Sequence, residues 1–173
     1  MSNFKLEIKK VLTAFGKDVV EQAKKNIKTS KISSKGHLYN GMKYKSKINN
    51  SSVEVVITIA DYWEYMDYGV EGVGGKKADG TNWVKRKVTN NKFKYREKTP
   101  PPSAFSRITS DRGGQFAIAK SVFHTGLKTT SFFTDPFDSE VDELEAELIQ
   151  ASYDAIEKGL TETIINNNNI TIK

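Results

Sequence analysis

The sequence predicts an α+β fold, in which a small antiparallel β-sheet packs against a long N-terminal and a long C-terminal helix and a loop or hairpin arm projects from the body. Apolar residues recur at helical spacing near both ends of the chain, and an alternating pattern lies at 42–60. A Gly-rich, basic stretch interrupts the chain at about 70–102. We therefore expect a single domain over residues 1–173, with an inserted basic arm at about 70–102 and a flexible C-terminal tail at about 163–173.

The N-terminal helix is predicted over residues 3–28. Its apolar residues return every three or four positions, with Lys and Glu between them: Phe4, Ile8, Val11, Leu12, Phe15, Val19, Ala23 and Ile27. An antiparallel hairpin follows a polar break. Over 42–48, Met42, Tyr44 and Ile48 alternate with lysines, and β-branched residues fill 53–60. The polar residues 49–52 between them have turn chemistry.

The next segment, residues 61–69, is too aromatic for a surface loop. Tyr62, Tyr65 and Met66 share a face at helical spacing, and Gly69 can end a helical turn in the left-handed conformation. We predict one or two helical turns with an aromatic face. Beyond it, residues 83–88 and 93–96 could form a second, basic hairpin. A loop this long inside a compact domain is usually functional or disordered.

The C-terminal third is predicted to be mostly helical. A short helix at 103–108 ends in a break at 111–114, a second helix spans 116–123 and ends at Gly126, and 129–134 is extended. Asp135 and Pro136 then suit the N-cap and first position of a final helix that runs to about Glu162. Its apolar stripe consists of Val141, Leu144, Leu148, Ala151, Ala155 and Leu160.

The residues give little sign of chemistry. The chain has no Cys and only two His, which lie in different segments without a partner at metal-binding spacing. The glycines near Lys76 fail the phosphate-loop pattern. Asp61, Glu64 and Asp67 could hold a cation beside Glu54, but a solvated helix edge is the better interpretation. We predict no catalytic, cofactor or metal site, no secretory signal, no membrane contact, and a protein that is not an enzyme.

Charge is separated along the chain. The net charge is +6, but residues 1–50 carry +9 and residues 134–173 carry −8. Such a chain can neutralise itself internally, or it can pair head to tail with a copy of itself, as neighbours in a ring do. Two solvated helix faces would give the same pattern.

The basic arm is the strongest local signal. It interleaves cations with aromatic residues: Lys76, Lys77, Trp83, Lys85, Arg86, Lys87, Lys92, Phe93, Lys94, Tyr95, Arg96 and Lys98. Cations can contact phosphates while aromatics stack on exposed bases, which predicts nucleic-acid binding. A loop that docks on an acidic neighbouring protein would have the same composition. We favour the protein partner and keep a small nucleic-acid-binding module, using residues 76–98, as the alternative function.

The order of elements resembles the head–tail connector and tail-completion proteins of tailed bacteriophages. Tyr62, Tyr65, Tyr68 and Gly69 match the tyrosine-containing segment that follows a strand in that family, and Phe132, Phe133 and Pro136 match the stretch that opens its last helix. The segment 116–126 is similar to that of the longer family members. The 70–102 insertion is longer and more basic than in the simple form.

The resemblance implies a non-enzymatic virion structural protein without a cofactor. It implies a homo-oligomeric ring of 6 or 12 subunits in the phage neck or tail top, assembled in the host cytoplasm, which joins the portal and head to the tail around the DNA passage. Its partners would be a portal or adaptor ring and tail proteins, with non-specific contact to DNA in the channel. We expect these residues to serve as packing or interface elements: Tyr62, Trp63, Tyr65, Tyr68, Gly69, Phe132, Phe133, Pro136 and Phe137.

Overall fold

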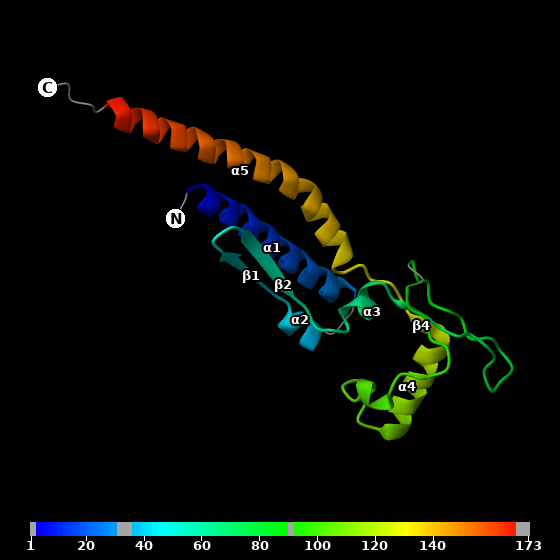
Figure 1. Cartoon of the computed structure of the whole chain (residues 1–173). Helices are drawn as coiled ribbons and strands as arrows, with labels where there is room; N and C mark the ends of the chain where they lie inside the picture. The colour runs from blue at the N-terminus through cyan, green and yellow to red at the C-terminus, as the bar shows by residue number, and fades with distance from the viewer. Residues whose placement is uncertain (1–2, 31–35, 90–91, 169–173) are drawn as a thin grey trace. The chain divides into compact units, whose positions relative to one another are not determined.

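The structure, a computed structural model, describes residues 3–30, 36–89 and 92–168 (Figure 1). The chain divides into two compact units. Unit 1 combines both ends of the chain, residues 1–60 and 132–173, and unit 2 consists of residues 61–131. The helices and small antiparallel sheets confirm the predicted α+β class.

Unit 1 contains α1 (Asn3–Thr29), α2 (His37–Gly41), β1 (Lys43–Ile48), β2 (Val53–Thr58) and α5 (Thr134–Asn168). In this unit α1 contacts α5 and also both strands of the hairpin, and Figure 1 shows α1 lying between them. The order of layers is therefore helix, helix, sheet. The predicted N-terminal helix is confirmed to within one residue at its C-terminal end.

The core of unit 1 follows one face of α1. Val19, Ala23 and Ile27 have no exposed surface, and neither do Met42 and Phe132. The steps of four residues between the three α1 side chains are those of one helix face, which is why the periodicity of the sequence predicts this core.

A glycine allows α1 to approach the hairpin closely. A Cβ atom on Gly16 would lie 2.6 Å from Cγ2 of Val55 and 3.3 Å from Cβ of Tyr44. Nearby, the Thr13 hydroxyl bonds the Ser46 hydroxyl at 2.7 Å. One face of the hairpin is thus packed on α1.

The hairpin has the register that its alternation predicts. Lys43 pairs with Thr58, Lys45 with Val56, and the ladder closes at Ile48 and Val53. The turn is fixed by the backbone N–H of Asn49, which donates to the carbonyl of Ser52 at 2.8 Å.

Unit 2 contains α3 (Trp63–Asp67), β3 (Val70–Glu71), the 3-10 helix η1 (Pro102–Phe105), α4 (Arg112–Thr125) and β4 (Gly126–Leu127). β3 pairs antiparallel with β4. Gly126 has φ +85°, and a Cβ there would collide with the carbonyl oxygen of Val70, so only glycine fits this crossing.

Two sequence predictions about helix ends are wrong. The helix predicted at 116–123 begins at Arg112, because the carboxylate of Asp111 accepts a hydrogen bond from the N–H of Gly114 at 2.5 Å and caps the first turn. The two glycines that suggested a break therefore lie inside the helix. The last helix differs from its prediction at both ends: it begins at Thr134, so Asp135 lies in its first turn and is not its N-cap, and it continues past Glu162 to Asn168, since no Pro or Gly follows Gly159. Part of the predicted flexible tail, residues 169–173, lies outside the described residues.

The predicted basic hairpin of 83–88 with 93–96 does not form in the described part of the arm. Lys94 instead makes an isolated parallel bridge with Glu71, and the antiparallel bridge in this region joins Lys76 to Asn82 around a tight turn. The aromatic residues that alternate with basic ones anchor the arm to the rest of unit 2, as the contacts below show. Helix α2 was not predicted.

Candidate functional site

The aromatic segment forms the helix α3 and is held at its C-terminal end by side chains from far along the chain. The Thr130 hydroxyl donates to the carbonyl of Met66, and the Thr129 hydroxyl donates to the carbonyl of Tyr68, both at 2.7 Å. Gly69 follows with φ +79°. The carbonyls that a helix leaves unpaired at its end are thus satisfied, as the ordering of this turn requires.

Residues of the basic arm pack against this aromatic segment. The ring of Phe93 lies 4.5 Å from that of Tyr65 and 6.4 Å from that of Tyr68, which itself lies 6.1 Å from Trp63. The ammonium of Lys92 stands 4.8 Å from the centre of the Tyr68 ring. Two sets of residues that the sequence singled out separately therefore form one cluster.

Two ion pairs connect the arm to the rest of unit 2. Nζ of Lys92 lies 2.9 Å from the Glu64 carboxylate, and Nζ of Lys85 lies 2.9 Å from that of Glu71. The hydrogen bond from Lys85 lowers the pKa of Glu71, and the hydrogen bond to Glu64 raises the pKa of Lys92. The two lysine side chains are exposed and the two carboxylates are partly exposed, at 35–45% in all, so these pairs contribute little stability and mainly fix orientation.

A second aromatic anchor holds the tight turn of the arm. The Trp83 ring stacks on His124 with centres 5.1 Å apart and planes within 3°. Nδ1 of His124 lies 2.6 Å from the carbonyl oxygen of Gly74, and the ammonium of Lys77 stands 5.3 Å from the Trp83 ring centre. His124 thus has a structural role.

Backbone hydrogen bonds fasten the arm along its length. Carbonyl groups at the C-terminal end of α4 accept hydrogen bonds from backbone N–H groups of the arm. Further backbone hydrogen bonds join Glu71 to the segment that contains Phe93 and Tyr95. The donors and acceptors are Glu71 to Phe93, Tyr95 to Glu71, Val73 to Phe123, Gly74 to His124 and Arg86 to Thr125, at 2.7–3.0 Å. In the described residues of the arm, the strand-like pairing between these hydrogen bonds is limited to the two isolated bridges.

The cations of the arm face solvent while its aromatic rings are half-buried. Trp83, Phe93 and Tyr95 are partly covered, and burial raises the pKa of the Tyr95 hydroxyl. All nine cations are exposed: Lys76, Lys77, Lys85, Arg86, Lys87, Lys92, Lys94, Arg96 and Lys98. Among the described residues only Lys85 and Lys92 of these have an ion-pair partner. The rings anchor the arm, and the cations form an exposed positive surface.

Unit 1 contains the other predicted residues. Phe132, Phe133 and Pro136 are buried and Phe137 is half-buried. The Phe137 ring stacks on Phe133 at 5.6 Å and meets Phe15 of α1 edge-on at 5.8 Å. In unit 2, by contrast, Tyr62 and Tyr65 are exposed at 43% and 47%.

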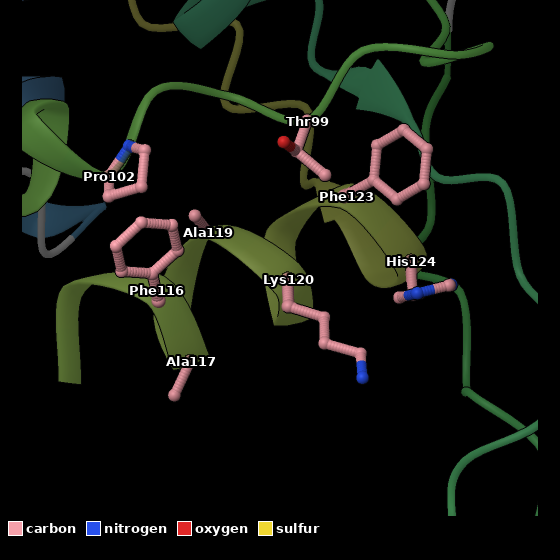
Figure 2. A pocket seen from close by; sticks show the side chains of 8 residues that line it. All are labelled: Thr99, Pro102, Phe116, Ala117, Ala119, Lys120, Phe123 and His124. Atoms are coloured by element: carbon pink, nitrogen blue, oxygen red, sulfur yellow. The ribbon is translucent and has the colours of Figure 1, made fainter. Parts of the chain in front are cut away.

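An apolar groove runs along one face of α4. Figure 2 shows Phe116 and Phe123 on the helix, with Pro102 opposite Phe116 and Thr99 near Phe123. Its lining contains one cation, and the full set is Thr99, Pro102, Phe116, Ala117, Ala119, Lys120, Phe123 and His124. Within the described residues no three His, Asp or Glu side chains gather to hold a metal ion. No helix in the described ranges is long and apolar enough to cross a membrane.

Sequence reasoning missed the residues that hold these elements in place. Thr129 and Thr130 cap α3, and His124 supports Trp83, yet nothing local in the sequence marks these roles. The contacts span about 40 to 60 residues of chain, so only a tertiary contact prediction could have found them.

Comparison with known proteins gives a match to a family model. Residues 2–69 match the family described as "Bacteriophage HK97-gp10, putative tail-component". The matched segment contains α1, α2, the hairpin and α3, and ends at Gly69. No curated protein matches the chain, and no solved structure does. The match confirms the resemblance to phage connector and tail-completion proteins, and it indicates a structural protein of a bacteriophage virion.

Proposed function

We propose that this protein is a non-enzymatic subunit of a ring in the phage neck or at the tail top, which joins the portal and head to the tail and surrounds the DNA passage. The match of residues 2–69 to a tail-component family is the observation that carries this proposal. The separation of charge supports it, since residues 1–50 at +9 and residues 134–173 at −8 favour pairing between copies.

The proposed partners are further copies of the chain in a ring of six or twelve, a portal or adaptor ring, and tail proteins. The exposed cations of the arm would contact an acidic surface on one of these, or the DNA in the channel. Because the aromatic rings of the arm pack against unit 2, few of them remain for stacking on bases. This distribution favours a protein partner for the arm.

Light scattering after size exclusion, with and without DNA, tests the proposal. We expect an assembly of six or twelve times the 19.4 kDa of the chain, formed alone or on a portal or tail template. The assembly should weaken as salt approaches 1 M, where screening shortens to about 3 Å. A chain that stays monomeric both at high concentration and inside purified particles contradicts the proposal.

Trypsin distinguishes the two roles of the arm. We expect cleavage between Lys76 and Lys98 in the free protein and protection in the particle, because the cations are exposed in the chain alone. Deleting the arm should abolish assembly. If the deletion variant assembles normally and loses salt-sensitive affinity for DNA, the nucleic-acid-binding function is the correct one.

A further inference from the structure

Helix α5 has a row of exposed residues that nothing in unit 1 covers. The row advances by three or four residues, so its members share one face of the helix: Asp138, Asp142, Glu145, Ile149, Tyr153, Ile156 and Leu160. The last four are exposed at 52%, 67%, 56% and 60%. Single exposed apolar residues are ordinary, whereas four in one row mark a surface that docks.

This row is distinct from the face of α5 that packs within unit 1. Ala155 is buried, and Leu144, Leu148 and Ala151 are half-buried on that inner face. The helix therefore has two apolar stripes, of which its own unit uses one. We call the uncovered one the outer row: three acids toward the helix start, then four large apolar side chains.

The hairpin has an uncovered face of opposite charge. Lys43, Lys45 and Lys47 alternate along β1 and are all exposed, with Val56 directly opposite Lys45 on β2 and exposed at 44%. Glu54 lies opposite Lys47 on the same face and is also exposed, and its carboxylate accepts a hydrogen bond from the Asn49 amide, so three lysines and one acid leave the face positive. The other face of the hairpin is the one packed on α1. Within the described part of the chain no acidic side chain forms an ion pair with these three lysines.

Apolar surface continues beyond the turn of the hairpin. Nζ of Lys5, in the first turns of α1, lies 3.3 Å from the carbonyl oxygen of Asn49 in that turn. Its neighbours Phe4 and Leu6 are exposed at 42% and 40%. Because residues 4 and 6 are two positions apart in a helix, Phe4 and Leu6 point to different sides of α1. The hairpin face thus offers lysines, and the start of α1 beside its turn offers one exposed apolar side chain on either side, as a partner for the outer row requires.

We propose that the outer row of α5 docks on the hairpin face of a second copy of this chain, acids on lysines and apolar side chains on the start of α1. The inference rests on the proposed function and names the surfaces that join subunits. The lengths agree: Asp138 to Glu145 spans about 10 Å of helix and Lys43 to Lys47 about 13 Å of strand. The aliphatic stems of the lysines and Val56 cover the apolar residues next to the acids.

Charge disfavours one competing contact, the full-length pairing of two outer rows. A parallel pair would bring acids against acids, and an antiparallel pair would bring the acids against Leu160, Ile156 and Tyr153, and both arrangements are unfavourable. In the proposed contact each copy uses two different surfaces, on opposite sides of α1 (Figure 1). Such a heterologous contact generates a ring when its rotation closes.

Cysteine cross-linking tests the contact directly, because the natural chain has no Cys. In a chain carrying both Lys45→Cys and Asp142→Cys, the two thiols lie on opposite sides of α1, so bonds form between copies. Under mild oxidation we expect a covalent ladder longer than a dimer, whereas either single substitution gives dimers at most. The control Lys45→Cys with Asp154→Cys, in which Asp154 is exposed on another side of α5, should give no such ladder.

Charge exchange provides the second readout. Changing Lys43, Lys45 and Lys47 to Glu should weaken self-association at least tenfold by sedimentation, and changing Asp138, Asp142 and Glu145 to Lys should do the same. Combining all six changes in one chain should restore association. If the protein assembles but the control ladder equals the test ladder, or the charge variants assemble normally, this contact is wrong while the ring stands. If the natural chain stays monomeric both alone and inside purified particles, both proposals fail.

Discussion

Replacing Phe133 by Ala should destabilise unit 1 strongly. Phe133 is 9% exposed, and its ring stacks on Phe137, which in turn meets Phe15 of α1. The substitution removes most of a buried ring and leaves a cavity between α5 and α1, a change that costs about 3–5 kcal/mol in protein cores. For a chain of this length, a loss of about 4 kcal/mol lowers the melting temperature by about 8–16 °C.

Circular dichroism melts and urea unfolding measure this loss. Phe116→Ala is the matched control, because it removes the same side chain at a position that is 53% exposed, and it should cost about 1 kcal/mol. Phe133→Leu keeps part of the side-chain volume, so its loss of stability should lie between that of the control and that of Phe133→Ala. This variant still gives a measurement if Phe133→Ala does not fold. Equal stability of Phe133→Ala and Phe116→Ala would refute the packing role of Phe133.

Substitutions at three further positions test local features. Gly126→Ala forces a side chain into φ +85° and against the Val70 carbonyl, so it should cost at least about 1–3 kcal/mol, and an unchanged melting temperature would contradict the crossing. Asp111→Ala removes the cap of α4 and should cost about 1 kcal/mol, while Asp111→Asn should retain most of it. Burial, and next the charge of Asp18, raise the pKa of Glu140, so its contribution to stability is full at acid pH and is lost as pH rises through the folded-state pKa. Glu140→Gln should therefore melt higher than the natural protein at pH 7, and the difference should vanish below about pH 4.

Much of unit 1 is predictable because its elements follow periodic patterns. The buried residues Val19, Ala23 and Ile27 repeat at helical spacing, and the hairpin alternates with a polar turn between its strands. These patterns arise from burial of one face, which is a local property of each element. They predict the elements themselves. Which surface α5 contacts, α1 and not the sheet, depends on tertiary packing.

Unit 2 is less predictable because its contacts join residues that are far apart in the sequence, and many of them involve backbone groups. The arm resembled a hairpin by composition, yet Glu71 pairs with Lys94, and Trp83 stacks on His124. Asp111 outweighed two glycines at the start of α4, since one side-chain cap can offset a low helix propensity in the first turn. Of the candidate site, composition predicted the exposed cations, and geometry supplied the cluster around Phe93.

The division of unit 1 between the two ends of the chain has a consequence for biosynthesis. About a hundred residues separate the end of α1 from the start of α5. At ordinary rates of translation the ribosome needs about 5–20 s to make them. During that interval the hairpin can cover its side of α1, but the side that receives α5 stays bare. All residues of unit 2 are made before α5 can complete unit 1. The newly made chain therefore passes through a stage in which apolar surface of α1 is exposed. At that stage chaperones of the translating cell have a binding site that the finished subunit lacks.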